Sequence, residues 1–173
     1  MPGSSIGTSM NFGFGGTVSR QTPAPSIEAK PVADDSDNIL FGQPVVLNSD
    51  NTFDAPTSTT LTAANFAGVA VAVAQQNNSY PPDNAVGHYE PESMCDVLQS
   101  GVILVEIQRG TPTSGGAVYV RVQESTESPG LVIGGFEAQA DGSQTVQLTN
   151  CSWATGIKDA NNMAELKVKT INN

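Results

Sequence analysis

After residue 38, short runs of β-branched and apolar residues alternate with turn-forming residues along the chain. Several runs place apolar and polar residues at alternate positions, a pattern typical of half-buried β-strands, and no heptad repeat accompanies them. This pattern predicts an all-β sandwich or barrel. Strands are expected at residues 39–47, 67–74, 93–98, 102–108, 117–123, 131–136, 144–148 and 164–171.

The strongest strand signal is VILVEIQ at residues 102–108, in which one face is wholly apolar and the other becomes polar at Glu106 and Gln108. After a glycine-containing loop, residues 117–123 (AVYVRVQ) alternate again, with valines on one face and Arg121 on the other. We expect these two strands to pair as a hairpin, with the valines in the core and Arg121 facing solvent.

Two of the expected strands are less regular. Gly42 and Pro44 interrupt residues 39–47, so this region should be an edge strand or two short pieces. Near the end of the chain, Asp159 offers a cap for a helix, but the period-two pattern of residues 164–171 favours a strand.

The first 38 residues differ in composition from the rest, because they are rich in Gly, Pro, Ser and Thr and their apolar residues are scattered. Such a segment cannot build a core of its own. We therefore expect an extended N-terminal docking arm at residues 1–38 and a β-sandwich domain at residues 39–173, although a terminus without a role is an open alternative. The expected partner-binding residues of the arm are Phe12, Phe14, Val18 and Ile27.

Charge and hydropathy exclude two classes of partner. The 173 residues carry a formal net charge of −10, which opposes direct binding to nucleic acid. The longest strongly apolar stretch, Phe66 to Ala74, is less than half of the roughly twenty residues that a membrane-spanning helix requires. We expect contact with neither nucleic acid nor a membrane.

The residues that could carry chemistry form no recognisable catalytic, cofactor or metal motif. Cys95 and Cys151 lack the spacing of a metal or redox site, which predicts two reduced, buried thiols. The acidic run at residues 34–37 lacks the glycine and distal glutamate of an EF-hand loop. His88 is the single histidine, and no nucleophile motif accompanies it. We expect no catalytic residue, no bound cofactor and no metal.

Several short motifs occur in an order that resembles the capsid cement, or decoration, proteins of tailed bacteriophages. They are FGQPV at residues 41–45, FAGVA at 66–70, the segment from Val97 to Val105 and GGAVYV at 115–120. The resemblance covers about half of the chain, residues 39–122, whereas residues 50–65 and 75–92 form longer loops than the motif spacing suggests.

This resemblance implies a jelly-roll-like or tulip-like β domain with neither enzymatic activity nor cofactor. It implies a protein made in the host cytoplasm that joins the outer surface of the virion. There it would bind the major capsid protein at junctions between shell subunits and stabilise the shell against the pressure of the packed DNA. We also expect a homo-oligomer, either a dimer or a trimer, because one assembly that grips several subunits is retained without any single strong contact.

Two other functions are compatible with the sequence. A surface adhesion or carbohydrate-binding β-sandwich would use loop aromatics such as Tyr80, Tyr89 or Trp153 to stack on sugars. A hydrolase would use His88 as a base and would place a serine or aspartate within reach of its imidazole.

Overall fold

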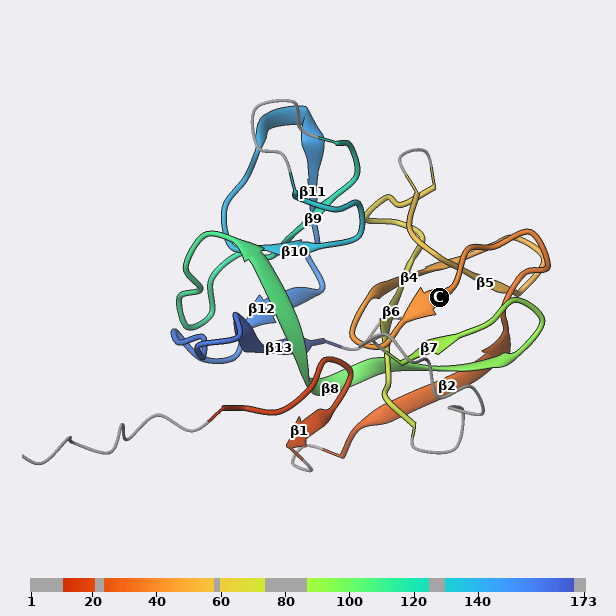
Figure 1. Cartoon of the computed structure of the whole chain (residues 1–173), viewed down its shortest axis with the longest axis horizontal. Helices are drawn as coiled ribbons and strands as arrows, with labels where there is room; N and C mark the ends of the chain where they lie inside the picture. The colour runs from red at the N-terminus through yellow and green to blue at the C-terminus, as the bar shows by residue number, and fades with distance from the viewer. Residues whose placement is uncertain (1–10, 21–23, 58–59, 74–86, 125–129, 170–173) are drawn as a thin grey trace, which may run out of the picture.

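The computed structural model describes residues 11–20, 24–57, 60–73, 87–124 and 130–169, and within them the chain is all-β, as predicted (Figure 1). The one helical element among the described residues is a short 3₁₀ turn, η1 (Gly142–Gln144). The strands are β1 (Val18–Arg20), β2 (Ser26–Pro31), β3 (Ile39–Leu40), β4 (Pro44–Leu47), β5 (Phe53–Asp54), β6 (Phe66–Ala70), β7 (His88–Tyr89), β8 (Met94–Arg109), β9 (Tyr119–Arg121), β10 (Phe136–Glu137), β11 (Thr145–Gln147), β12 (Cys151–Trp153) and β13 (Met163–Val168).

Eleven of these strands belong to one sheet, whose main path runs β11-β9-β10-β8-β6-β4-β5. Strands β1, β2 and β13 also pair with β8, β12 pairs with β13, and β3 and β7 form a separate two-stranded ribbon. None of the described residues forms a helix with the length and hydropathy that crossing a membrane requires.

The long strand β8 organises the whole sheet. It unites the two strands expected at residues 93–98 and 102–108, and Gly101, with φ of 142°, lies where they join. Strands β2 and β6 pair with its amino-terminal half, β1 and β13 pair with its carboxy-terminal half, and β10 runs parallel to its end. Figure 1 shows β8 crossing from the group β2 and β4–β7 to the group β9–β13.

The buried apolar residues form two hydrophobic cores. The first core is larger: it includes residues of β8 to β13, among them Ile107 and Trp153, and it also reaches across to Val46 of β4 and to Phe66 and Val69 of β6. The second core includes residues of β3 to β8, among them Phe53 and Tyr89. Because β8 supplies Leu98 to the first core and Val97 to the second, one strand connects the two cores.

The predicted hairpin of residues 102–108 with residues 117–123 is wrong. Strand β10 lies between β8 and β9, with Phe136 opposite Ile107 in a parallel pair and opposite Val120 in an antiparallel pair. The predicted inward valines are correct, because Val118, Val120 and Val122 are buried. Periodicity within a strand indicates its faces but does not identify its neighbour.

The predicted exposure of Arg121 is also wrong, because its side chain is fully buried. Its Nε atom lies 2.6 Å from Glu137 Oε1, its Nη2 atom lies 2.6 Å from Asp141 Oδ2, and its Nη1 atom donates to Gln144 Oε1 at 3.0 Å. Glu137 belongs to β10, the inserted strand, so the misplaced neighbour also explains the misplaced arginine. The hydrogen bonds from Arg121 and Arg109 hold the pKa of the Asp141 carboxyl below its usual range.

Other predictions are confirmed in part. Residues 39–47 form the two pieces β3 and β4, and the end of the described chain is strand β13. The expected loop at residues 50–65 contains β5 and supplies Phe53 and Leu61 to the cores. Residues 75–86 of the other expected loop lie outside the described residues.

Candidate partner-binding surface

The N-terminal segment from Asn11 to Thr17 is fixed to the body through its backbone. Gly16 N–H donates to the Leu104 carbonyl of β8 at 2.8 Å, and the Gly16 carbonyl accepts from Ala72 N–H at 2.8 Å. Leu104 N–H in turn donates to the Thr17 carbonyl at 2.9 Å. The segment therefore joins β8 to the chain that follows β6, with strand β1 continuing along β8.

Glycine at positions 16 and 42 makes this close approach possible. A Cβ atom on Gly42 would lie 2.7 Å from the Gly16 nitrogen, and a Cβ atom on Gly16 would lie 2.8 Å from the Ala72 nitrogen. Both glycines also have positive φ, of 82° at Gly16 and 81° at Gly42, which other residues rarely adopt. The glycine-rich sequence of the segment thus has a packing role.

A carboxylate holds the beginning of the described segment. Phe12 N–H donates to Asp159 Oδ2 at 2.8 Å, while Asp159 Oδ1 accepts from the N–H groups of Asn161 and Met163 at 2.9 Å each. Burial alone would raise the pKa of Asp159, but the N–H groups of Phe12, Met163 and Asn161 outweigh it and leave the pKa below its usual range. Asp159 does not cap a helix; instead it fastens the N-terminal segment.

An ion pair secures β1 at the other end of the segment. Arg20 Nη2 lies 2.5 Å from Glu165 Oε2 on β13, and Arg20 Nε donates to Glu165 Oε1 at 3.1 Å. The hydrogen bond from Arg20 lowers the pKa of the Glu165 carboxyl. Strands β1 and β13 pair with the same part of β8, so the two side chains join strands that are far apart in sequence.

The four arm residues expected to bind a partner have different surroundings. Phe14 is 84% exposed, and Ile27 on β2 is 46% exposed. Phe12 is half-buried, and Val18 packs against the first core. The Phe14 carbonyl accepts from Thr17 N–H at 3.2 Å, so Phe14 begins a turn whose end is bonded to β8. Phe14 is thus an exposed aromatic side chain on a fixed backbone.

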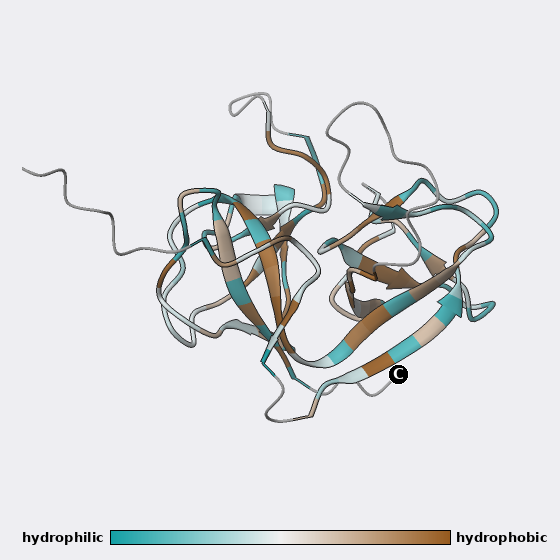
Figure 2. Ribbon diagram, turned by 60° about the horizontal axis from the view of Figure 1, so that its bottom comes forward, coloured by the Kyte–Doolittle hydropathy of each residue, from teal (hydrophilic) through white to brown (hydrophobic). Residues whose placement is uncertain are grey.

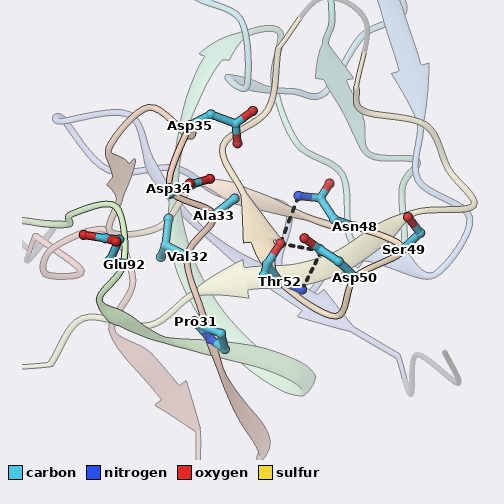
Figure 3. A pocket seen from close by; sticks show the side chains of 10 residues that line it. All are labelled: Pro31, Val32, Ala33, Asp34, Asp35, Asn48, Ser49, Asp50, Thr52 and Glu92. Carbon is cyan, nitrogen blue, oxygen red and sulfur yellow. Dashed lines mark hydrogen bonds between the residues drawn. The ribbon is translucent and has the colours of Figure 1, made fainter.

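An acidic pocket of about 590 Å³ lies on the other side of the molecule, beside the second core. Figure 3 shows Asp34 and Asp35 at one side of it, Asp50 at another and Glu92 pointing away from them. Thr52 donates to Asp50 Oδ1 from its hydroxyl at 2.7 Å and from its N–H at 3.1 Å, and these hydrogen bonds lower the pKa of Asp50. The acidic run at residues 34–37 was visible in the sequence, but the fold determines that Asp50 and Glu92 line the same pocket.

The remaining candidates for chemistry are dispersed. Cys95 and Cys151 are free and buried, as predicted, and burial raises the pKa of the Cys151 thiol to about 12. Burial also raises the pKa of the Cys95 thiol. His88 Nε2 lies 4.0 Å from Glu90 Oε1. Among the described residues, no group of three or more His, Cys, Asp or Glu side chains is arranged to hold a metal ion.

Two of the three aromatic residues of the adhesin alternative, Tyr89 and Trp153, are buried and not available for stacking on sugars. Tyr89 is fully buried, donates its hydroxyl to the Val71 carbonyl at 2.6 Å and contacts Phe41 edge to face. Trp153 is 1% exposed. Tyr80, the third residue of that alternative, lies outside the described residues.

Comparison with known proteins agrees with this fold. A chain of "The capsid of Myoviridae Phage XM1" has a similar fold, with a TM-score of 0.69 and 16% sequence identity over 98% of each chain. No curated protein matches the chain. The sequence model of the family described as "Structural cement protein (E217 gp24/Pam3 gp6)" matches residues 2–169. This match spans nearly the whole chain, and the protein therefore belongs to the phage structural cement protein family.

Proposed function

We propose that this cement protein sits on the outer surface of the phage shell, binds the major capsid protein at junctions between subunits and stabilises the shell against internal DNA pressure. The observation that carries this proposal is Phe14, which is 84% exposed although the backbone around it is bonded to β8. An aromatic side chain held on a fixed turn loses little conformational freedom when it enters a pocket on a partner. The role is structural, without catalysis.

The attachment of the N-terminal segment to the body supports a mechanical role. Pulling on a docked Phe14 acts on the Gly16–Leu104 hydrogen bond and on the Arg20–Glu165 ion pair, and both lead to strands of the central sheet. Contacts of one rigid body with two shell subunits raise the effective concentration of each contact. Load on the shell must then break several contacts together.

The distribution of charge supports a second contact. Residues 24–98 contain ten of the seventeen Asp and Glu residues but one of the seven Lys and Arg residues, so nearly all of the net charge lies in this part of the chain. The acidic pocket belongs to it. We infer that this part meets a basic surface of the shell, which predicts that binding weakens as the salt concentration rises.

Binding of purified protein to shells that lack it tests the role of Phe14. Phe14→Ala should weaken binding by about thirtyfold or more, because truncating a central aromatic anchor costs at least about 2 kcal/mol. Val132→Ala is the matched control, since Val132 is 60% exposed and lies outside the N-terminal segment. Equal binding of the two variants would contradict the role of Phe14.

A cryo-EM map of the decorated shell tests the position. The proposal requires density outside the shell that touches more than one subunit; density inside the shell, or on a single subunit, contradicts it. Deletion of residues 1–10 leaves all of the contacts described above in place, whereas deletion of residues 1–38 also removes β1, β2 and the buried Val32. The shorter deletion is therefore the appropriate companion variant.

A further inference from the structure

The loop between β12 and β13 presents an apolar side chain, Ile157, on a fixed backbone. Ile157 is 59% exposed. Before it, Ala154 N–H donates to the Glu165 carbonyl at 2.9 Å. After it, Asp159 N–H donates to the Met163 carbonyl at 3.0 Å. Both acceptors belong to β13, so the loop is closed onto this strand on either side of the exposed side chain.

The two charged residues that follow Ile157 are occupied within the chain. Lys158 Nζ donates to the Gly110 carbonyl at 3.3 Å, and the Asp159 carboxylate accepts from the three backbone N–H groups described above. Residues 154–157 themselves carry no charge. Neither charged group therefore requires a partner outside the chain, and the surface that suits Ile157 is an apolar one.

Ile157 lies at the same end of the molecule as Phe14. The hydrogen bond from Phe12 N–H to Asp159 Oδ2 joins their two segments, and Figures 1 and 2 both show the beginning of the N-terminal segment at the end that carries the loop between β12 and β13. Phe14 and Ile157 are each two residues from this bond, which keeps their Cα atoms within about 20 Å of each other. A standard interface covers about 800 Å² on each partner, roughly 30 Å across, so one contact can include both side chains.

We propose that Ile157 is a second anchor of this protein and forms, together with Phe14, one apolar contact with a shell subunit. This inference rests on the proposed function and deepens it, because it names a further residue and the chemistry of the surface that receives it. Asp159 fastens the two segments to each other, so both anchors are ordered before binding and little conformational freedom is lost. The contact differs from the one inferred for the acidic part of the chain, because it buries apolar surface and does not depend on opposite charges.

Binding of the full-length protein to shells that lack it tests the second anchor. Ile157→Ala should weaken binding by about tenfold, because it removes three carbon atoms that the contact buries. Val132→Ala is the matched control: Val132 is 60% exposed, and its N–H is also held in place, donating to Gln108 Oε1 at 2.9 Å. This control should bind as the unmodified protein does. Equal binding of the two variants would overturn the proposal.

A pair of variants of nearly equal shape tests the chemistry of the contact. Ile157→Val should keep most of the affinity, whereas Ile157→Thr, which replaces a methyl group of that valine by a hydroxyl, should lose about as much as Ile157→Ala. The ratio of affinities between the unmodified protein and Ile157→Thr should stay the same as the salt concentration rises. An unchanged melting temperature of Ile157→Thr shows that the fold is intact. Equal binding of the valine and threonine variants, or a ratio that falls towards one in salt, would contradict an apolar contact.

A photoreactive benzophenone side chain at position 157 identifies what covers it. On decorated shells it should attach to the major capsid protein, and the same group at position 132 should not. Attachment to a second copy of this chain, or to another part of the same copy, would refute the proposal. If the Ile157 variants bind normally while Phe14→Ala does not, the second anchor is refuted and the proposed function stands. An unmodified protein that does not bind shells refutes both.

Discussion

At the residue scale, a buried pair of opposite charges, Arg121 and Glu137, lies among otherwise apolar buried residues. Arg121 and Glu137 are both fully buried and lie 2.6 Å apart, and Asp141 and Gln144 occupy the other nitrogens of the guanidinium. Taking such a pair out of water is costly, so both partners are needed. The pair links β9 to β10. Because both strands are short, this link favours the observed register over a shifted pairing of the two strands.

Removing one partner of this pair should be strongly destabilising. Glu137→Ala leaves Arg121 buried beside a cavity, and we expect a loss of about 3–5 kcal/mol in the free energy of unfolding, measured by chemical denaturation. Glu124→Ala, at an exposed position, is the control and should change the stability by less than about 0.5 kcal/mol. A loss below about 1 kcal/mol for Glu137→Ala would show that the pair is not needed for stability.

Asp141, the partly exposed carboxylate bonded to Arg121 and Arg109, should make the free energy of unfolding depend on pH. Arg121 and Arg109 lower the pKa of Asp141 in the folded protein, so its ionised form contributes stability above the pKa of the unfolded chain. That contribution should be lost as the pH falls through the folded-state pKa. Asp141→Asn should flatten the fall of stability in acid relative to the unmodified protein, and parallel pH profiles would contradict this assignment.

At the element scale, the N-terminal segment illustrates what the sequence predicts and what it does not. Composition separated residues 1–38 from the rest, but β1 and β2 within them pair with β8. These strands are invisible in the sequence because their partner is a distant strand and their side chains are largely exposed. The role of the segment as a docking arm stays a prediction, now centred on Phe14.

Strand faces could be predicted from alternation, whereas strand neighbours could not. The apolar face of residues 102–108 lies in the first core, as predicted, since Ile103, Val105 and Ile107 all belong to it. The insertion of β10 beside β8 is set by long-range pairing, and Phe136–Glu137 is too short to show a period. The acidic pocket could not be predicted either, because its lining residues come from segments that only the fold brings together.

The hydrogen bond between Phe12 and Asp159 should make the attachment of the N-terminal segment sensitive to pH. Asp159 has a lowered pKa in the folded state, so its ionised form holds the segment above the pKa of the unfolded chain and releases it as the pH falls through the lowered value. The Phe12 amide resonance should therefore titrate in acid, below the usual range of a carboxyl. Asp159→Ala should remove this titration; an unaltered titration would assign it to another group.

At the scale of the whole molecule, β8 makes the two cores one folding unit. It contributes Val97 to the second core and Ile107 to the first, and its backbone pairs with strands on both sides. Loss of either core exposes apolar residues on β8 and removes a neighbour from the other core. A protein that transmits load between shell subunits requires such a continuous connection, because a hinge between two independent cores would yield first.

This connection predicts a single unfolding transition. Phe53→Ala in the second core and Ile107→Ala in the first should each cost about 2–5 kcal/mol and lower one common melting temperature in calorimetry. Val132→Ala, at a 60% exposed position, is the control and should leave that temperature nearly unchanged. If Phe53→Ala instead split the transition in two, with one part at the original temperature, the cores would be independent. The β8 strand would then not carry load between them, and the mechanical part of the proposed function would have to rest on one core alone.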